Sequence, residues 1–335
     1  MAAKGMTQSR PLVSVVFSFR NEQDNIPVLI SRLEAVFAPE PVDYELIFVN
    51  DASTDRSLAL LLEARASNPR VKVITMSRRF GVSACVRAGM AAASGDAVVY
   101  MDADLQDPPE VIPRLLDQWR AGADVVHTVR THRHGESAVK MLLTRIAYRI
   151  IQFGSTIELP VNAGDFKLLS RAAVAQLLAL RESDPYLRGL VVWLGFTQAF
   201  VPYERDARHA GRTHFPFFSR NPWKTFAMGV TTASFMPIYA CMAAAAAGAV
   251  AIVLVTAAAL VLMATGSPLA ATTGLVVLLT FFWTTIMAGF AAIGLYIVRI
   301  YKDVRQRPQY IVASTVGLPE LGSMSVEAEI EHAGR

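Results

Sequence analysis

The chain has 335 residues, of which 53 % are hydrophobic and 18 % are charged. This length supports one large domain or two modest ones with a substantial core. The formal net charge of +4 does not indicate nucleic-acid binding, because no nucleic-acid motif accompanies the basic residues; anionic lipid headgroups or phosphates are the expected partners. The two cysteines, Cys85 and Cys241, predict no disulfide and agree with a reducing compartment.

The first hundred residues alternate apolar runs with helical patterns. Residues 1–10 are polar, lack the apolar core of a signal peptide and are expected to be flexible. Near-continuous apolar runs predict four strands, at residues 12–17, 44–49, 71–74 and 97–101. Helical patterns separate these strands, at about 25–37, 55–66 and 82–93. The alternation predicts an α/β domain with a mostly parallel sheet, which we assign to residues 11–212.

Polar side chains follow three of the predicted strands at the point where each strand ends. The clusters are Arg20-Asn21-Glu22, Asn50-Asp51 and Asp102-Ala103-Asp104. Parallel strands bring their carboxyl ends to one edge of a sheet, and open α/β sheets bind their ligands beyond that edge. The sequence therefore predicts a site where the three clusters meet.

The third cluster has the chemistry of a metal site. Asp102 and Asp104 are one residue apart, so in extended backbone both carboxylates project to the same side. Mg²⁺ typically uses one or two carboxylates together with substrate phosphates, and Gln106 offers a further carbonyl oxygen. A solvated acidic turn is the alternative. Asp107 and Glu110 are assigned to the turn and to the start of the next helix, where negative charge suits the helix dipole.

The second half of the chain contains a long segment without charge. Trp193, in the run RGLVVWLGF, is expected to pack in a buried strand. Residues 225–298 contain no Asp, Glu, Lys or Arg, and a membrane helix needs about 20 apolar residues. This segment predicts a hairpin of two transmembrane helices within 237–299, at about 238–264 and 270–298. A helical hairpin buried in a soluble core is the alternative.

Basic residues flank the predicted hairpin on both sides, while its connecting turn is uncharged. They are Arg212, Arg220 and Lys224 before it, and Arg299, Lys302, Arg305 and Arg307 after it. Because positive residues stay on the cytoplasmic side, we expect the α/β domain and the tail, residues 300–335, to be cytoplasmic. Aromatic and basic residues in 213–236 predict an interfacial segment beside the membrane.

Five stretches, in this order, resemble the family 2 glycosyltransferases that act on polyprenyl phosphates. They are VSVVFSFRNEQDNIP, YELIFVNDASTD, SRRFGVSACVRAGMAAASGDAVVYMDADLQDPPE, HTVRTHRHGES and NAGDFKLLSRAAV. The resemblance covers roughly residues 11–312, paired C-terminal spans included. The chain departs from the family pattern at Ser18 and Arg20, where Pro and Tyr are common, and at His214, which replaces a Lys.

The resemblance implies a GT-A fold, which is Rossmann-like, and an inverting transfer of a sugar from a nucleotide donor to a polyprenyl phosphate. The donor is expected to be a UDP-sugar, with UDP-glucose as the first candidate. The acceptor is expected to be undecaprenyl phosphate, at the cytoplasmic face of a bacterial inner membrane that the chain crosses more than once. A homo-oligomer is compatible with the sequence.

The resemblance also implies roles for individual residues. The catalytic residues would be Asp165, Asp104 and Arg130. The residues that contact the nucleotide sugar would be Ser18, Arg20, Glu22, Asp51, Arg78 and Asp102. The residues that hold Mg²⁺ or Mn²⁺ against the donor pyrophosphate would be Asp102, Asp104 and Gln106. The residues that bind the acceptor phosphate would be Arg130, Arg133, Lys140, Arg208, Arg212 and His214.

Two other functions are weighed against this one. A processive polysaccharide synthase shares the fold but carries a Gln-x-x-Arg-Trp motif and more membrane spans, and the sequence has neither. A non-catalytic membrane scaffold would be expected to lose its acidic residues, whereas Asp102, Asp104 and Asp165 are all present.

Overall fold

The chain separates into two compact units. A computed structural model describes residues 10–131, 163–183, 185–205, 236–265 and 268–318. Of these, the first unit contains residues 10–131, 163–183, 185–205 and 308–318, and the second contains residues 236–265 and 268–307. The first unit therefore consists of segments that lie on both sides of the second in the sequence.

The first unit is built on an eight-stranded sheet in the order β7-β5-β6-β4-β1-β2-β3-β8. Its strands are β1 Leu12–Phe19, β2 Asp43–Asn50, β3 Val71–Met76, β4 Ala97–Asp102, β5 Val125–Arg130, β6 Ala163–Ser170, β7 Gln198–Tyr203 and β8 Val312–Val316. Strand β1 pairs in parallel with β2 and β4, β2 with β3, and β5 with β7. Strands β6 and β8 are antiparallel to their neighbours. The predicted α/β class with a mostly parallel sheet is confirmed.

Helices cover both faces of this sheet, which explains why the central strands are apolar along their whole length. On one face, the sheet shares a hydrophobic core with α1 Ile26–Phe37, α2 Ser57–Ser67 and α4 Ile112–Arg120. Helix α4 follows the short 3₁₀ helix η1 Pro109–Val111. On the other face, the sheet shares a second hydrophobic core with α3 Val82–Ala92, α6 Arg171–Ala179 and α7 Leu187–Trp193. Helix α3 lies so close to β1 that a side chain at Gly89 would overlap Val16.

The prediction that Trp193 packs in a buried strand was wrong. This residue ends helix α7, and its side chain is 56 % exposed. The helix buries Leu187, Leu190 and Val191 instead, a spacing that fits one helical face. A short apolar run does not by itself distinguish a strand from a buried helix, and here the tertiary contacts favour the helix.

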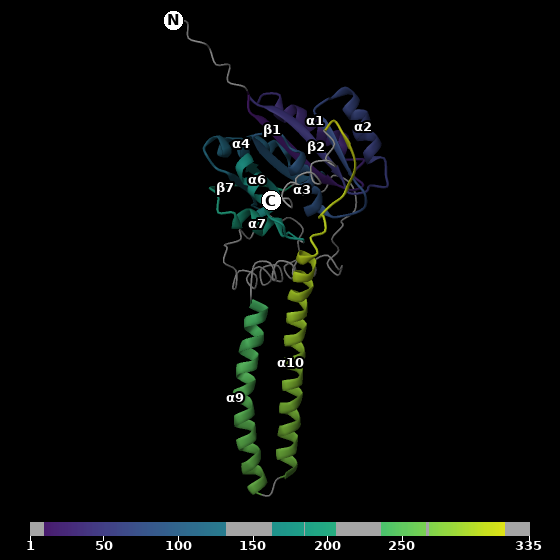
Figure 1. Ribbon diagram of the computed structural model, residues 1–335. Helices are drawn as coiled ribbons and strands as arrows, with labels where there is room; N and C mark the ends of the chain where they lie inside the picture. The colour runs from purple at the N-terminus through teal and green to yellow at the C-terminus, as the bar shows by residue number, and fades with distance from the viewer. Residues whose placement is uncertain (1–9, 132–162, 184, 206–235, 266–267, 319–335) are drawn as a thin grey trace, which may run out of the picture. The chain divides into compact units, whose positions relative to one another are not determined.

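The second unit is a pair of long helices, α9 Met236–Ala264 and α10 Pro268–Val304, which run side by side (Figure 1). Both are long and apolar enough to cross a membrane, over Ile238–Ala264 and Thr272–Val304, and only 6 % of either span is buried within the protein. Such exposure does not fit the alternative of a hairpin buried in a soluble core.

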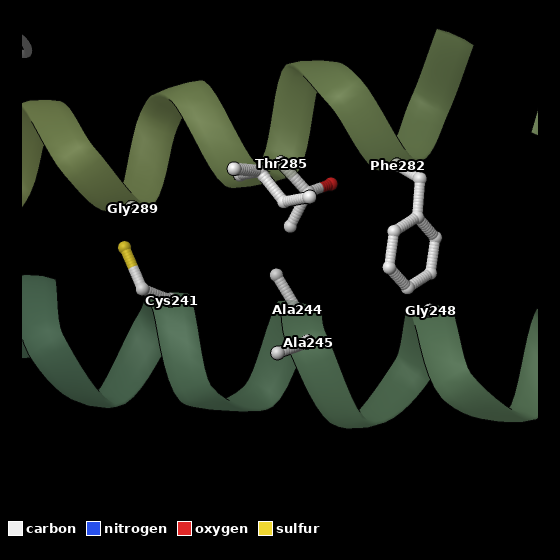
Figure 2. Close-up of a pocket in the computed structure, with 8 residues that line it drawn as sticks. Cys241, Ala244, Ala245, Gly248, Phe282, Thr285 and Gly289 are labelled. Carbon is white, nitrogen blue, oxygen red and sulfur yellow. The ribbon is translucent and has the colours of Figure 1, made fainter. Parts of the chain in front are cut away.

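Small residues allow the two helices to approach closely. Figure 2 shows the pocket between them, where Cys241, Ala244, Ala245 and Gly248 of α9 face Phe282, Thr285 and Gly289 of α10. A Cβ atom at Gly248 would lie 3.1 Å from the Phe282 ring. Small residues at contact positions are a common basis for helix packing in membranes.

The segment after α10 rejoins the first unit. The sequence prediction assigned residues 300–335 to a tail, but α10 continues to Val304 and residues 312–316 form β8, which pairs with β3. The Ser77 amide donates a hydrogen bond to the Ile311 carbonyl (3.0 Å), and the Gln309 side-chain amide donates to the Glu182 carbonyl. Part of the predicted tail therefore belongs to the sheet; residues 319–335 lie outside the described part of the chain.

Candidate active site

The carboxyl ends of the strands converge as the sequence predicts. Strand register places Ser18 of β1 opposite Asp102 of β4, and Phe19 opposite Asn50 of β2. Because β6 is antiparallel to both β4 and β5, its first residues and the last residue of β5, Arg130, lie at this same edge. The end of β7, Tyr203, is paired with Arg130. One edge of the sheet therefore collects the side chains of six strands.

Unusual backbone geometry marks three of these strand ends. Asn21, Ala52 and Leu105, which follow β1, β2 and β4, have positive φ angles of 56°, 55° and 58°. Residues other than glycine adopt this conformation at a cost of roughly 1–3 kcal/mol each, and such residues concentrate at functional sites. The loops also support one another, since the Asn21 side-chain oxygen accepts a hydrogen bond from the Thr54 amide (2.8 Å).

The Asp102–Gln106 turn has the properties expected of a metal site. Burial, followed by repulsion from Asp104, Asp165 and Asp107, raises the pKa of Asp102 to about 8, so a bound cation would stabilise its ionised form. The Asp104 carboxylate accepts a hydrogen bond from the Gln106 amide (3.2 Å), which fixes the turn. Oxygen donors of this kind fit Mg²⁺ or Mn²⁺.

The turn does not form a complete coordination shell. Among the described residues, no three His, Cys, Asp or Glu side chains are arranged to hold a metal ion by themselves. Two carboxylates leave coordination positions for substrate oxygens and water, which is the usual mode of Mg²⁺ binding beside phosphates.

Asp165 lies next to Asp102 but in a different electrostatic environment. The β4–β6 register pairs Val98 with Leu169 and Tyr100 with Lys167, and its continuation brings Asp165 opposite Asp102. Arg188 of α7 binds Asp165 through two hydrogen bonds, one of which joins Nε to Oδ1 over 2.6 Å. Although burial opposes ionisation, Arg188, then Lys167 and Arg130, lower the pKa of Asp165 to about 2.

The two neighbouring carboxylates therefore differ in what they can do. Asp165 is ionised and already paired with a guanidinium, which makes it a poor proton acceptor and a well-oriented hydrogen-bond acceptor. Asp102 has no ion pair with the described residues, although Arg205 attracts it at longer range, and it is the one that gains from a metal ion. Environments that drive two carboxyl pKa values apart commonly separate their roles in an active site.

Asp107 lies in the turn after β4, as predicted, and a second group of charges surrounds it. This side chain is 1 % exposed and accepts hydrogen bonds from the Tyr203 hydroxyl and from Arg205 Nε (3.1 Å). Arg130 Nη2 lies 3.9 Å from the same carboxylate, and its Nε donates to the Tyr203 hydroxyl (3.1 Å). Asp107 thus holds two guanidinium groups at the edge of the sheet. The other predicted turn residue, Glu110, pairs with Arg32 of α1.

Gly164 makes room for Arg130. A Cβ atom built on Gly164 would lie 2.9 Å from Arg130 Nη2, closer than side chains approach in folded proteins. The absence of a side chain immediately before Asp165 therefore lets the Arg130 guanidinium lie against β6.

Asp51 organises the loop between β3 and α3. Its carboxylate accepts hydrogen bonds from the amides of Phe80 (2.6 Å) and Gly81 (3.2 and 3.1 Å to the two oxygens). The Arg78 guanidinium stacks over the Phe80 ring at 4.0 Å from its centroid. The structure therefore brings two of the residues predicted to contact the nucleotide, Asp51 and Arg78, to one loop.

The other residues predicted to contact the nucleotide lie at the end of β1. Ser18 and Glu22 are buried, and Arg20 is half-buried. Glu22 accepts a hydrogen bond from Asn25 (2.5 Å) at the start of α1, and its amide donates to Ser57 (2.9 Å). Their contacts with a nucleotide remain a prediction.

Not every predicted site residue can be located. Arg133, Lys140, Arg208, Arg212 and His214 lie outside the described residues, as does most of the predicted interfacial segment.

Sequence reasoning missed Arg188, Tyr203 and Arg205. Arg188 is 23 residues from Asp165 in the chain, and Arg205 is 98 residues from Asp107. No spacing rule connects such pairs, because α7 and β7 reach the site only through the tertiary fold. The one available signal was that both arginines adjoin apolar segments. Arg188 lies within α7, which packs against the sheet, and Arg205 follows β7.

Comparison with known proteins identifies the family of the chain. The model of the family described as Glycosyl transferase family 2 matches residues 14–178. An uncharacterized glycosyltransferase of Bacillus subtilis, YkcC, is 38 % identical over 306 residues, which are 91 % of this chain and 94 % of that protein. The bactoprenol glucosyl transferase of Shigella phage SfII is 32 % identical over 304 residues, 90 % of this chain and 97 % of that protein.

Matches to solved structures are weaker. Staphylococcus aureus TarS 1-349 in complex with UDP-GlcNAc has a TM-score of 0.44 and 17 % identity, covering 66 % of this chain and 67 % of that one. Glucosyl-3-phosphoglycerate synthase from Mycobacterium tuberculosis, with Mn²⁺, UDP-glucose and phosphoglyceric acid, has a TM-score of 0.45 and 20 % identity, covering 65 % and 79 %. From its sequence relatives and its domain match, the chain belongs to glycosyltransferase family 2, among relatives that include the bactoprenol glucosyl transferases.

Proposed function

We propose that this glycosyltransferase moves a glucose unit from UDP-glucose to undecaprenyl phosphate, with inversion of the anomeric centre. The observation that carries the proposal is the edge of the sheet where Asp102 and Asp104 face a group of arginines. Such a site suits a substrate pair that carries a diphosphate and a phosphate. The proposed acceptor and sugar are taken from the bactoprenol glucosyl transferases, which are about a third identical over nine-tenths of this chain.

Asp102, Asp104 and Gln106 are the residues that would hold Mg²⁺ or Mn²⁺. When bound, the metal ion supplies positive charge that neutralises the departing nucleoside diphosphate. Arg130 and Arg205, which Asp107 holds at the same edge of the sheet, would also neutralise this negative charge, because guanidinium groups bind phosphate oxygens in bidentate fashion. Asp51 and Arg78 set the loop against which the nucleobase is expected to lie.

The acceptor needs little activation by the protein. A phosphate monoester has a second pKa of roughly 6 and is therefore already anionic near neutral pH, unlike a sugar hydroxyl. We therefore assign Asp165 to orienting a sugar hydroxyl of the donor, and not to removing a proton. Its pairing with Arg188, which keeps the carboxylate ionised and fixed, supports this assignment. Much of the rate enhancement then comes from positioning the two substrates.

Membrane anchoring follows from the proposed acceptor and from the topology of the chain. Residues up to Arg205 and residues from Pro308 onward belong to the same unit, and β8 is hydrogen-bonded into its sheet. The chain between them must therefore leave and return on the same side of a membrane, so an even number of crossings is required. Two apolar helices joined by an uncharged turn meet this requirement, with the catalytic unit on the cytoplasmic side.

The test is to incubate the purified full chain in detergent with Mg²⁺, undecaprenyl phosphate and a panel of nucleotide sugars. We expect labelled glucose in the lipid fraction from UDP-glucose. The variant Asp104→Asn should lose both this transfer and metal-dependent donor binding, whereas the exposed Asp117→Asn on α4 should retain both. No lipid-linked sugar from any donor would refute the proposed reaction, and undiminished turnover of Asp104→Asn would refute the metal assignment.

A separate experiment tests the topology. A C-terminal reporter that is active only in the periplasm should give no signal, and a cytoplasmic reporter at the same position should be active. A strong periplasmic signal would contradict the hairpin.

A further inference from the structure

A row of buried polar side chains lies directly behind the proposed site. Strand register places Phe200 beside His127, His127 beside Lys167, and Lys167 beside Tyr100, across β7, β5, β6 and β4. Side chains paired in this way share one face of a sheet. Lys167 and Tyr100 are each 1 % exposed, and His127 is fully buried.

Burial of the Lys167 ammonium is electrostatically unfavourable. Burial lowers the pKa of Lys167 to about 8, and attraction to Asp165 opposes that shift. A buried ionised group without a close ion-pair partner costs folding free energy, so an apolar side chain of similar size at this position should not lower stability. The stability of the fold therefore does not account for a lysine at this position.

His127 and Tyr100, which the strand register places beside Lys167, each carry a group that can accept a hydrogen bond. His127 Nε2 lies 2.9 Å from the Gln198 side-chain oxygen, which can only accept, so Nε2 carries the proton and Nδ1 is an acceptor. Burial, followed by the charge of Lys167, lowers the pKa of His127 to about 4, so the ring is neutral at physiological pH. Neither His127 Nδ1 nor the Tyr100 hydroxyl has a hydrogen-bond partner among the described residues. Both of these atoms belong to residues that the strand register pairs with Lys167.

The charge of Lys167 acts on Asp165. These two residues are separated by one position on β6 and therefore project from the same face. Arg188 already binds both oxygens of Asp165 from α7, so Lys167 is not needed as a counter-ion. It places a second positive charge under the carboxylate, on the interior side.

We propose that Lys167 is a positioning residue for sugar transfer: from a buried row with His127 and Tyr100, its positive charge attracts the Asp165 carboxylate on the same face of β6 and so favours one orientation of that carboxylate at the edge of the sheet. The inference rests on the proposed function, because it assigns the effect to the step in which Asp165 orients the donor sugar. It predicts a lysine that lowers stability or leaves it unchanged while raising the rate of transfer.

The decisive variant is Lys167→Met in the full chain, assayed with Mg²⁺, UDP-glucose and undecaprenyl phosphate. We expect kcat to fall by roughly 10–100-fold, as for a misplaced catalytic group, with KM for UDP-glucose changed by less than about threefold. The midpoint of thermal unfolding should be equal to or higher than that of the wild type. Lys167→Arg, which keeps the charge, should recover part of kcat.

Lys72→Met is the matched control. Lys72 is a largely buried lysine on β3 that pairs with Glu45, away from the proposed site. Its loss should lower the unfolding midpoint and leave kcat of the folded protein unchanged. The same pattern in Lys167→Met, or its failure to fold, would mean that Lys167 is structural and would overturn the proposal. Absence of transfer by the wild type would instead refute the proposed function, so the two failures are distinguishable.

Discussion

The pairing of Arg188 with Asp165 allows a sharp test of how the site is organised. Replacing Arg188 by Gln removes a positive charge and both hydrogen bonds to Asp165. A charge-assisted hydrogen bond contributes about 1.5–3 kcal/mol in a buried setting. Here 35 % of the Arg188 side chain and 32 % of the Asp165 side chain are exposed, so solvent screening should reduce the loss of folding stability to about 1–2 kcal/mol for the whole pair.

The effect on activity should be larger than the effect on stability. Without Arg188, the Asp165 carboxylate loses both guanidinium hydrogen bonds and keeps only the longer-range attraction of Lys167 and Arg130. We expect kcat to fall by roughly 100-fold because the carboxylate is no longer held in one orientation. In the wild type the pKa of Asp165 is lowered to about 2, so the group stays ionised across the usual assay range. In the variant its pKa should rise, because burial favours the protonated form and only the attraction of Lys167 and Arg130 remains to oppose it.

The assay measures transfer of labelled glucose to the lipid fraction between pH 4.5 and 8, about the range in which carboxyl and imidazole groups titrate. The variant should lose additional activity as the pH falls, whereas Asp165 should contribute no such loss in the wild type. Arg181→Gln, an exposed arginine on the segment that leads to α7, is the control and should match the wild type. An Arg188→Gln enzyme with wild-type kcat and an unchanged pH profile would refute the role given to the pair.

Two further predictions concern the support of the site and the stability of the sheet. Gly164→Ala should lower kcat by about tenfold with little loss of stability, because the new Cβ displaces the movable Arg130 guanidinium; wild-type turnover would show that Arg130 need not lie against β6. Glu45→Ala should cost about 3–5 kcal/mol in urea unfolding, since the buried carboxylate accepts hydrogen bonds from Ser14 (2.5 Å) and the Ser94 amide (2.7 Å) and pairs with Lys72. Burial opposes ionisation of Glu45, but Lys72, Ser14 and Ser94 hold its pKa below the usual value, so its contribution should be complete above about pH 4.5 and disappear at lower pH. A loss of unfolding free energy below about 1 kcal/mol would indicate that the contacts of Glu45 with Ser14, Ser94 and Lys72 do not act as a buried network.

The sequence by itself was sufficient for the parts of this protein that depend on local patterns. Strands buried on both faces are continuous apolar runs, so β1, β2, β3 and β4 were predicted within a few residues. Their parallel order followed from the helices between them, and it places Asn21, Asp51 and Asp102 at one edge of the sheet. The two long helices were equally evident, because a segment of that length without charge has few alternatives.

Tertiary structure alone decided which charges act together. The insertion of the antiparallel strand β6 between β4 and β5 places Asp165 opposite Asp102 and Lys167 beside Tyr100. Neither a hydrophobic period nor a motif specifies that register. Likewise, Arg188 and Arg205 reach their carboxylates from elements far along the chain, and β8 returns to the sheet only after the second long helix. Ion pairs and strand order depend on distances in space, and a sequence pattern records only distances along the chain.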